Sequence, residues 1–136
     1  MITIDEMSEM LDEVAEELPK EVFHKLNGGV SLLQETKLSK ADPEGGLYTL
    51  GEYHHNQMGR YIVLYYGSIS AVHRYDSKEK LKVNLKKLLT HELTHHLESL
   101  AGEKDLEVKD KMDLDDYFRT KRRRSKRRAE SGELRE

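Results

Sequence analysis

The sequence contains no cysteine and no tryptophan, and it has only two prolines among its 136 residues. The lack of cysteine excludes disulfide bonds and thiolate metal sites, so histidine, aspartate or glutamate must hold any transition metal. The chain also lacks a run of about 18 apolar residues, the length that a membrane-spanning helix requires. Its acidic start, MITIDEMSEM, does not have the pattern of a secretory signal peptide. The sequence therefore predicts a cytoplasmic protein with no membrane partner.

Apolar residues make up 36% of the chain and charged residues another 36%, which predicts a single domain with a modest core. The net charge of -3 hides an asymmetry. Residues 119–128, RTKRRRSKRR, include eight Lys or Arg and no acid, whereas residues 1–118 hold 23 acidic and 14 basic residues. We expect a domain over residues 1–118 and a disordered basic tail over residues 119–136. The basic run could bind nucleic acid or an acidic partner, or it could be a solvated tail, since it has no aromatic residues for base stacking.

Two helices are expected at the start of the chain. Apolar residues recur at steps of three and four over residues 4–18, which indicates one buried helix face. Thr3 and Glu6 fit a capping box at its beginning. Pro19 ends this helix and can open a second short one over residues 19–26.

The middle of the chain reads as strands. Residues 30–36 predict a first strand, and residues 37–46 a loop because of their Pro, Gly and Asp content. Residues 47–55 and 61–66 predict two strands joined by a turn at residues 56–59, and hence a hairpin. The second of these, YIVLYY, is continuously apolar, which is typical of a buried strand.

A long helix should follow, with Asp76 as its cap and Glu79 in the reciprocal position. Leu81, Leu85 and Leu88 define its expected buried face, and Gly102 its end. A weakly patterned helix over residues 104–118 is a further expectation. Together these elements predict an α+β fold: an N-terminal helix pair, a small sheet with a hairpin, and one long helix.

That long helix contains the stretch LLTHELTHHLESLAGEKD, residues 88–105. At about 100° per residue, His91, Glu92 and His95 fall in line with its leucine stripe, where unpaired polar side chains would be unfavourable. Histidines at positions i and i+4 converge, and both nitrogens can reach one zinc ion at about 2.1 Å. In this H-E-x-x-H pattern Glu92 is the general base that activates a zinc-bound water for attack on a carbonyl. The alternative is a pair of core histidines bonded to protein neighbours.

The residues LLTHELTHHL, together with RYIVLYYGSI and the helix pair before it, resemble the zincins, and more narrowly a small single-domain family of bacterial zinc metallopeptidases. The resemblance covers about residues 4–110 and implies a minimal zincin-like fold. By analogy with zincins, Tyr61 to Ser68 would form the strand that borders the cleft and can pair with an extended substrate.

The family pattern is HExxHxxGxxD, in which the aspartate is the third zinc ligand. Here Glu98 stands at the glycine position, and Gly102-Glu103-Lys104-Asp105 supplies a GxxD four residues later. On that match Asp105 is the expected third ligand. Glu98, Glu107 and Asp110 are the alternatives. His96 is expected to support a ligand or to lie at the surface, and His73 to serve in a cap or loop.

These features predict a zinc-dependent hydrolase, most simply a metallopeptidase acting on a peptide or protein, with zinc as cofactor. A metal-dependent ribonuclease is a second hypothesis, but its usual motif has a further histidine downstream, and none follows His96. The third hypothesis is a non-catalytic metal-binding or nucleic-acid-associated module.

Overall fold

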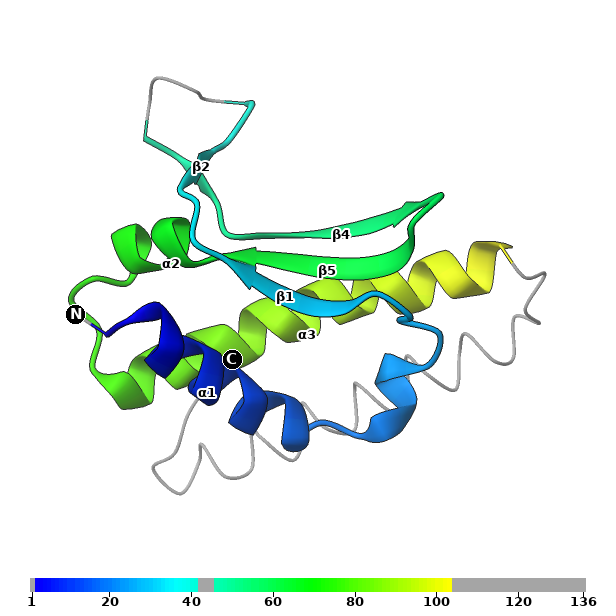
Figure 1. Cartoon of the computed structure of the whole chain (residues 1–136), viewed down its shortest axis with the longest axis horizontal. Coiled ribbons are helices and arrows are strands. Elements are labelled where there is room, and N and C mark those ends of the chain that lie inside the picture. Colours follow the sequence, from blue (N-terminus) through cyan, green and yellow to red (C-terminus); the bar gives the residue numbers. More distant parts are fainter. Residues whose placement is uncertain (1, 42–45, 104–136) are drawn as a thin grey trace, which may run out of the picture. The chain divides into compact units, whose positions relative to one another are not determined.

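A computed structural model describes residues 2–41 and 46–103 of the chain (Figure 1). The described residues divide after His96 into two compact units, and the second holds only residues 97–103, which end the last helix. The predicted domain boundary at residue 118, the helix over residues 104–118 and the basic tail all lie outside the described residues.

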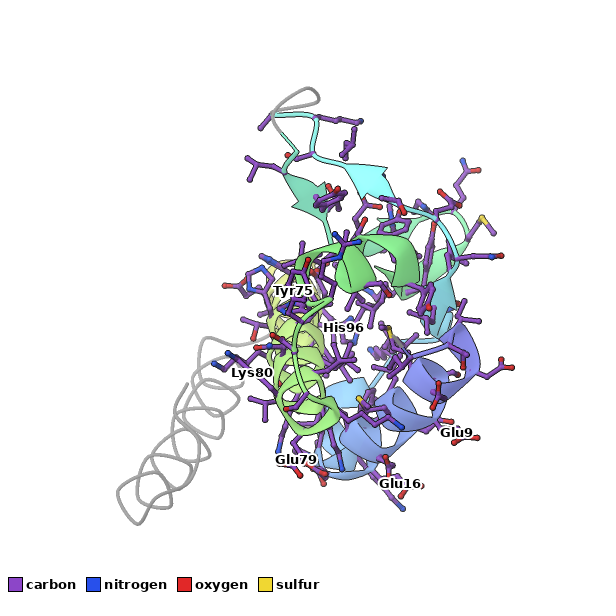
Figure 2. The ribbon with its side chains drawn as sticks, turned by 90° about the vertical axis from the view of Figure 1, so that its left-hand side faces the viewer. Glu9, Glu16, Tyr75, Glu79, Lys80 and His96 are labelled. Carbon is purple, nitrogen blue, oxygen red and sulfur yellow. The ribbon has the colours of Figure 1, made fainter. Side chains whose placement is uncertain are left out.

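The chain begins with α1 (Ile4–Glu16) and a short 3₁₀ helix, η1 (Lys20–Phe23). The predicted capping box is confirmed: the Glu6 amide donates to Thr3 Oγ1 at 3.1 Å, and the Thr3 amide donates to Glu6 Oε1 at 2.8 Å. Four residues of α1 are buried, and Glu9 and Glu16 lie on its outer side (Figure 2). The buried four are Met7, Met10, Leu11 and Val14.

The main sheet has three strands in the order β1 (Gly29–Leu33), β5 (Gly59–Tyr65) and β4 (Gly51–Asn56). β1 runs parallel to β5, with Gly29 opposite Tyr61, and β4 runs antiparallel to it. The predicted hairpin is therefore confirmed as β4 and β5. A second, two-stranded sheet pairs β2 (Lys37–Leu38) with β3 (Tyr48–Thr49), within and beside the segment that was expected to be a loop.

One prediction about this sheet is wrong. By the zincin analogy Tyr61 to Ser68 would border a cleft and could pair with an extended substrate, but β5 ends at Tyr65 and has β1 and β4 on its two sides, which leaves no edge for a substrate. The helix α2 (Tyr66–Val72) follows it directly. The continuous apolar run of β5 suits a strand that has neighbours on both sides. The edge strand that lies near the long helix is β4.

The long helix α3 spans Lys78–Glu103. Its part within the first unit, up to His96, lies beneath the sheet, with α1 beside it (Figure 1). Its cap is Ser77 rather than Asp76, because Ser77 Oγ accepts the Lys80 amide at 3.1 Å. Asp76 instead accepts a bond from the Asn84 side chain at 2.8 Å. The α+β class predicted from the sequence is confirmed by this arrangement.

None of the helices within residues 2–41 and 46–103 is long and apolar enough to cross a membrane.

Candidate metal centre

His91 and His95 point toward one another from successive turns of α3. Their Nε2 atoms are 3.1 Å apart, and their rings meet edge to face with centroids 4.6 Å apart. Two nitrogens on one tetrahedral zinc, each at about 2.05 Å, are about 3.4 Å apart. Both side chains are exposed, so the pair faces solvent. The two imidazoles therefore fit one zinc ion with little rearrangement.

The expected burial of these imidazoles is wrong, although their convergence is confirmed. The centre of the buried face of α3 is formed by Leu85, Leu89 and Leu93, each at most 1% exposed, while Leu88 is only half-buried. At about 100° per residue this centre lies about 75° from the leucine stripe expected from the sequence, which moves His91 and His95 to the solvent side of the helix.

Glu92, by contrast, is buried, with 6% of its surface exposed. Burial raises the pKa of its carboxyl above the usual value; His91 and His95 act against this rise, and the nearby carboxylate of Glu52 adds to it. A carboxylate in such a place is a better proton acceptor than one in water, and a high pKa in a metal motif is typical of a general base.

Glu52 on β4 is the centre of a polar cluster that sequence reasoning missed. Its Oε1 accepts the Tyr65 hydroxyl at 2.6 Å and lies 3.1 Å from His54 Nε2, while its Oε2 pairs with Lys37 Nζ at 2.6 Å. Burial raises the pKa of Glu52, but the hydrogen bonds from Lys37, Tyr65 and His54 outweigh it and lower the pKa to about 2. Residues 37, 52 and 65 are far apart in the sequence, and nothing in their spacing predicts this cluster.

His96 is fully buried. Of its two expected roles, the position at the surface is therefore wrong. Its Nε2 donates to the His24 carbonyl at 2.6 Å, because a carbonyl can only accept. Its Nδ1 therefore accepts the Tyr53 hydroxyl at 2.9 Å. Burial lowers the pKa of His96, in agreement with a neutral ring.

The segment of α3 that carries Glu92 lies alongside β4, one of the two edge strands of the sheet. A Cβ atom placed on Gly51 would lie 3.4 Å from Leu88 Cδ1, and Tyr53 meets His96 eight residues further along the helix. Glu92 lies between these two contacts, so its position beside β4 follows. His91 and His95 project from the neighbouring strip of the helix, on its solvent side.

The backbone of β4 has a defined polarity. The Tyr65 amide donates to the Leu50 carbonyl at 2.9 Å, which, with the β4–β5 register, makes residues 52 and 54 the partners that exchange bonds with β5. The amide and carbonyl groups of Gly51 and Tyr53 consequently point away from β5, toward the outer edge of the three-stranded sheet.

The positions of His91 and His95 do not identify a third metal ligand. Asp105, Glu107 and Asp110 lie outside the described residues. Glu98 follows His95 by three residues in α3 and is exposed. Within residues 2–41 and 46–103, no three His, Asp or Glu side chains are grouped so as to hold a metal ion.

The remaining histidines that could have been ligands lie elsewhere or have other partners. His73 bonds to Asp76 Oδ2 at 2.9 Å, before the start of α3, in agreement with the expected loop role. His54 stacks on Tyr61 with centroids 4.9 Å apart. His55 is exposed near the end of β4.

No family model and no curated protein matches the chain. Among solved structures it is similar to a conserved hypothetical protein from Thermo thermophilus, with 31% sequence identity and a TM-score of 0.65. The match covers 75% of this chain and 100% of that protein. At this identity over the whole length of the solved protein, the chain belongs to the family of that conserved hypothetical protein.

Proposed function

We propose that this protein is a zinc-dependent hydrolase, and most simply a metallopeptidase. The observation that carries the proposal is the 3.1 Å approach of His91 Nε2 and His95 Nε2 with the buried Glu92 between them in sequence. In this proposal His91 and His95 are ligands, Asp105 is the third ligand, and Glu92 is the general base. A bound zinc ion would polarise the scissile carbonyl and lower the pKa of a water molecule toward about 7.

The protein's own groups supply the proton transfers. The Glu92 carboxylate accepts a proton from the attacking water and then delivers it to the departing amine nitrogen. Its raised pKa supports the first step, because a carboxylate with a raised pKa accepts a proton more readily than an ordinary one. The half-buried Glu52, held by Lys37 and Tyr65, stays ionised and adds to the negative potential beside Glu92.

The edge strand β4 supports a peptide substrate rather than a small ester or amide. Its outward backbone groups at Gly51 and Tyr53 can pair with an extended peptide, which would lie along α3 and pass the two histidines. The proposed location is the cytoplasm. Contact of the 119–128 run with nucleic acid or an acidic partner remains a prediction, since those residues lie outside the described part.

The first test of the proposal compares metal content and peptide hydrolysis in three variants. We expect purified wild-type protein to hold one zinc ion by elemental analysis, and His91→Ala to lose it. Glu92→Gln should keep the zinc while its hydrolysis of a quenched fluorescent peptide library falls by a factor on the order of 10² to 10⁴.

Glu79→Gln is the matched control, because Glu79 is an exposed carboxylate in the first turn of the same helix (Figure 2). It should behave as wild type in both measurements. A wild-type protein that takes up no zinc at any loading concentration would refute the proposal. Zinc binding without any hydrolysis of the peptide library by wild type would instead favour the non-catalytic metal-binding module, and full hydrolysis by zinc-loaded Glu92→Gln would overturn the role of Glu92 as general base.

A further inference from the structure

A chain of partly buried hydrogen bonds links the edge strand β4 to α3, the helix that carries His91 and His95. Arg60 Nη1 donates to the Tyr53 hydroxyl oxygen at 2.8 Å, and that hydroxyl donates to His96 Nδ1 at 2.9 Å. His96 Nε2 in turn donates to the His24 carbonyl at 2.6 Å. Arg60 is 6% exposed and His96 is 0% exposed, and Figure 2 shows His96 inside the molecule between α3 and the sheet.

Every bond in this chain has one allowed direction. The His24 carbonyl is an acceptor only, which places the single ring proton of neutral His96 on Nε2. Nδ1 must then accept, so the Tyr53 proton points to it, and the Tyr53 oxygen is left to accept from Arg60. Because its bonds point one way and its members Arg60 and His96 are buried, the chain holds one rotation of α3 about its axis better than apolar packing alone would.

The rotation of α3 matters for the metal centre in a particular way. His91 and His95 share this helix, so a rotation leaves their separation unchanged. Their Nε2 atoms lie about 6 Å from the helix axis, and a rotation of about 10° would move both by about 1 Å relative to β4. A displacement of 1 Å between a catalytic centre and a bound substrate can lower a rate on the order of 10²-fold.

We propose that Tyr53 is a positioning residue that, through His96, sets the distance between the His91–His95 pair and the edge strand β4. This inference rests on the proposed function, because that distance matters only if a metal ion acts on a peptide paired with β4. Removal of the Tyr53 hydroxyl should leave zinc binding intact. It should weaken the binding of a ligand that contacts the metal and β4 at the same time.

The test uses two probes on zinc-loaded protein. Acetohydroxamate binds the metal alone, whereas tetra-alanine hydroxamate binds the metal and can also pair with β4. We expect Tyr53→Phe to bind acetohydroxamate as wild type does, within twofold, and to bind tetra-alanine hydroxamate about tenfold more weakly by calorimetry. Its kcat on a quenched fluorescent peptide library should fall by about tenfold or more, at a temperature at which circular dichroism shows it folded.

His96→Gln breaks the same link from the other side, since its amide can still donate to the His24 carbonyl but leaves no group at Nδ1. The double variant Tyr53→Phe/His96→Gln should therefore lose little more tetra-alanine hydroxamate affinity than either single variant. Tyr66→Phe is the matched control, because it removes a hydroxyl that donates to the Ile2 carbonyl at 2.5 Å, away from the metal centre.

The outcomes separate the two proposals. A wild-type protein without zinc affinity would refute the hydrolase proposal. With zinc bound, equal affinities of wild type and Tyr53→Phe for tetra-alanine hydroxamate would overturn the positioning role, and so would a wild type that binds both hydroxamates equally well. A loss in Tyr66→Phe as large as in Tyr53→Phe would show that general destabilisation is the cause.

Discussion

At the residue scale, Glu52 gives a prediction about acid stability. Its pKa of about 2 lies below the usual glutamate value of 4.5, so the folded protein binds its proton less readily than the unfolded chain does. This contribution is fully present above about pH 4.5 and is lost as the pH falls toward 2. After solvent screening it amounts to roughly 2 kcal/mol, which urea unfolding at pH 5.5 and pH 3 should detect.

Glu52→Gln removes the ionisable group and should flatten this part of the stability profile. Glu9→Gln is the control, since Glu9 is an exposed carboxylate on the outer side of α1. If the loss between pH 5.5 and pH 3 is equally large in Glu52→Gln and wild type, other carboxylates carry the acid sensitivity.

His91, His95 and His96 show which properties of single residues could be predicted from the sequence and which could not. The spacing of His91 and His95 predicted their convergence, because side chains four residues apart in a helix meet whatever the helix packs against. It did not predict which histidine is buried. Leucines stand at 81, 85, 88, 89 and 93, so the apolar stripe is too wide to reveal its centre, and the buried ring proved to be His96. Its partners, Tyr53 and the His24 carbonyl, come from distant segments.

At the element scale, the start of α3 is testable through its cap. Ser77→Ala removes the oxygen that accepts the Lys80 amide and should lower the free energy of unfolding by about 1 kcal/mol. Ser8→Ala is the control, because Ser8 is exposed within α1 and alanine is the better helix former there. Urea unfolding at neutral pH measures both. An unchanged Ser77→Ala protein would mean that Asp76 or solvent caps the helix.

The helices and strands differ in how much of them could be predicted. α1 and its capping box followed from periodicity and two residues, since both are local properties. α2 was missed because Tyr66 to Val72, YGSISAV, is only seven residues long and mixes small polar with apolar residues, so it carries no clear helical period. The neighbour of α2, the Glu35 carbonyl that accepts the Gly67 amide at 3.0 Å, could not be known from sequence.

At the scale of the whole molecule, zinc should stabilise the fold by mass action. A ligand that binds only the folded state adds about 2.7 kcal/mol when its free concentration is 100 times the Kd. Wild-type protein should therefore show a rising Tm with added zinc in calorimetry, and His91→Ala should not. A Tm that rises equally in both proteins would place the zinc elsewhere.

The α+β class was predictable for the whole molecule because strong local signals, a capped helix, a hairpin and a long helix, occur in an order that leaves few architectures. The order of the strands was not. β1 pairs with β5 across the intervening residues 34–58, and this pairing makes β4 the edge beside α3. The expected role of Tyr61 to Ser68 depended on that long-range pairing, which is why the analogy assigned substrate pairing to a strand that proved to be central.

The solvent-facing position of His91 and His95 has a consequence for how such a protein would be supplied with its metal. An ion held at the rim of a helix can be reached by a dissolved chelator without any opening of the core. Loading and stripping should then be rapid exchanges with the surrounding pool, faster than unfolding. The fraction of active molecules would follow the free zinc concentration, so that scarcity of the metal would itself switch the protein off.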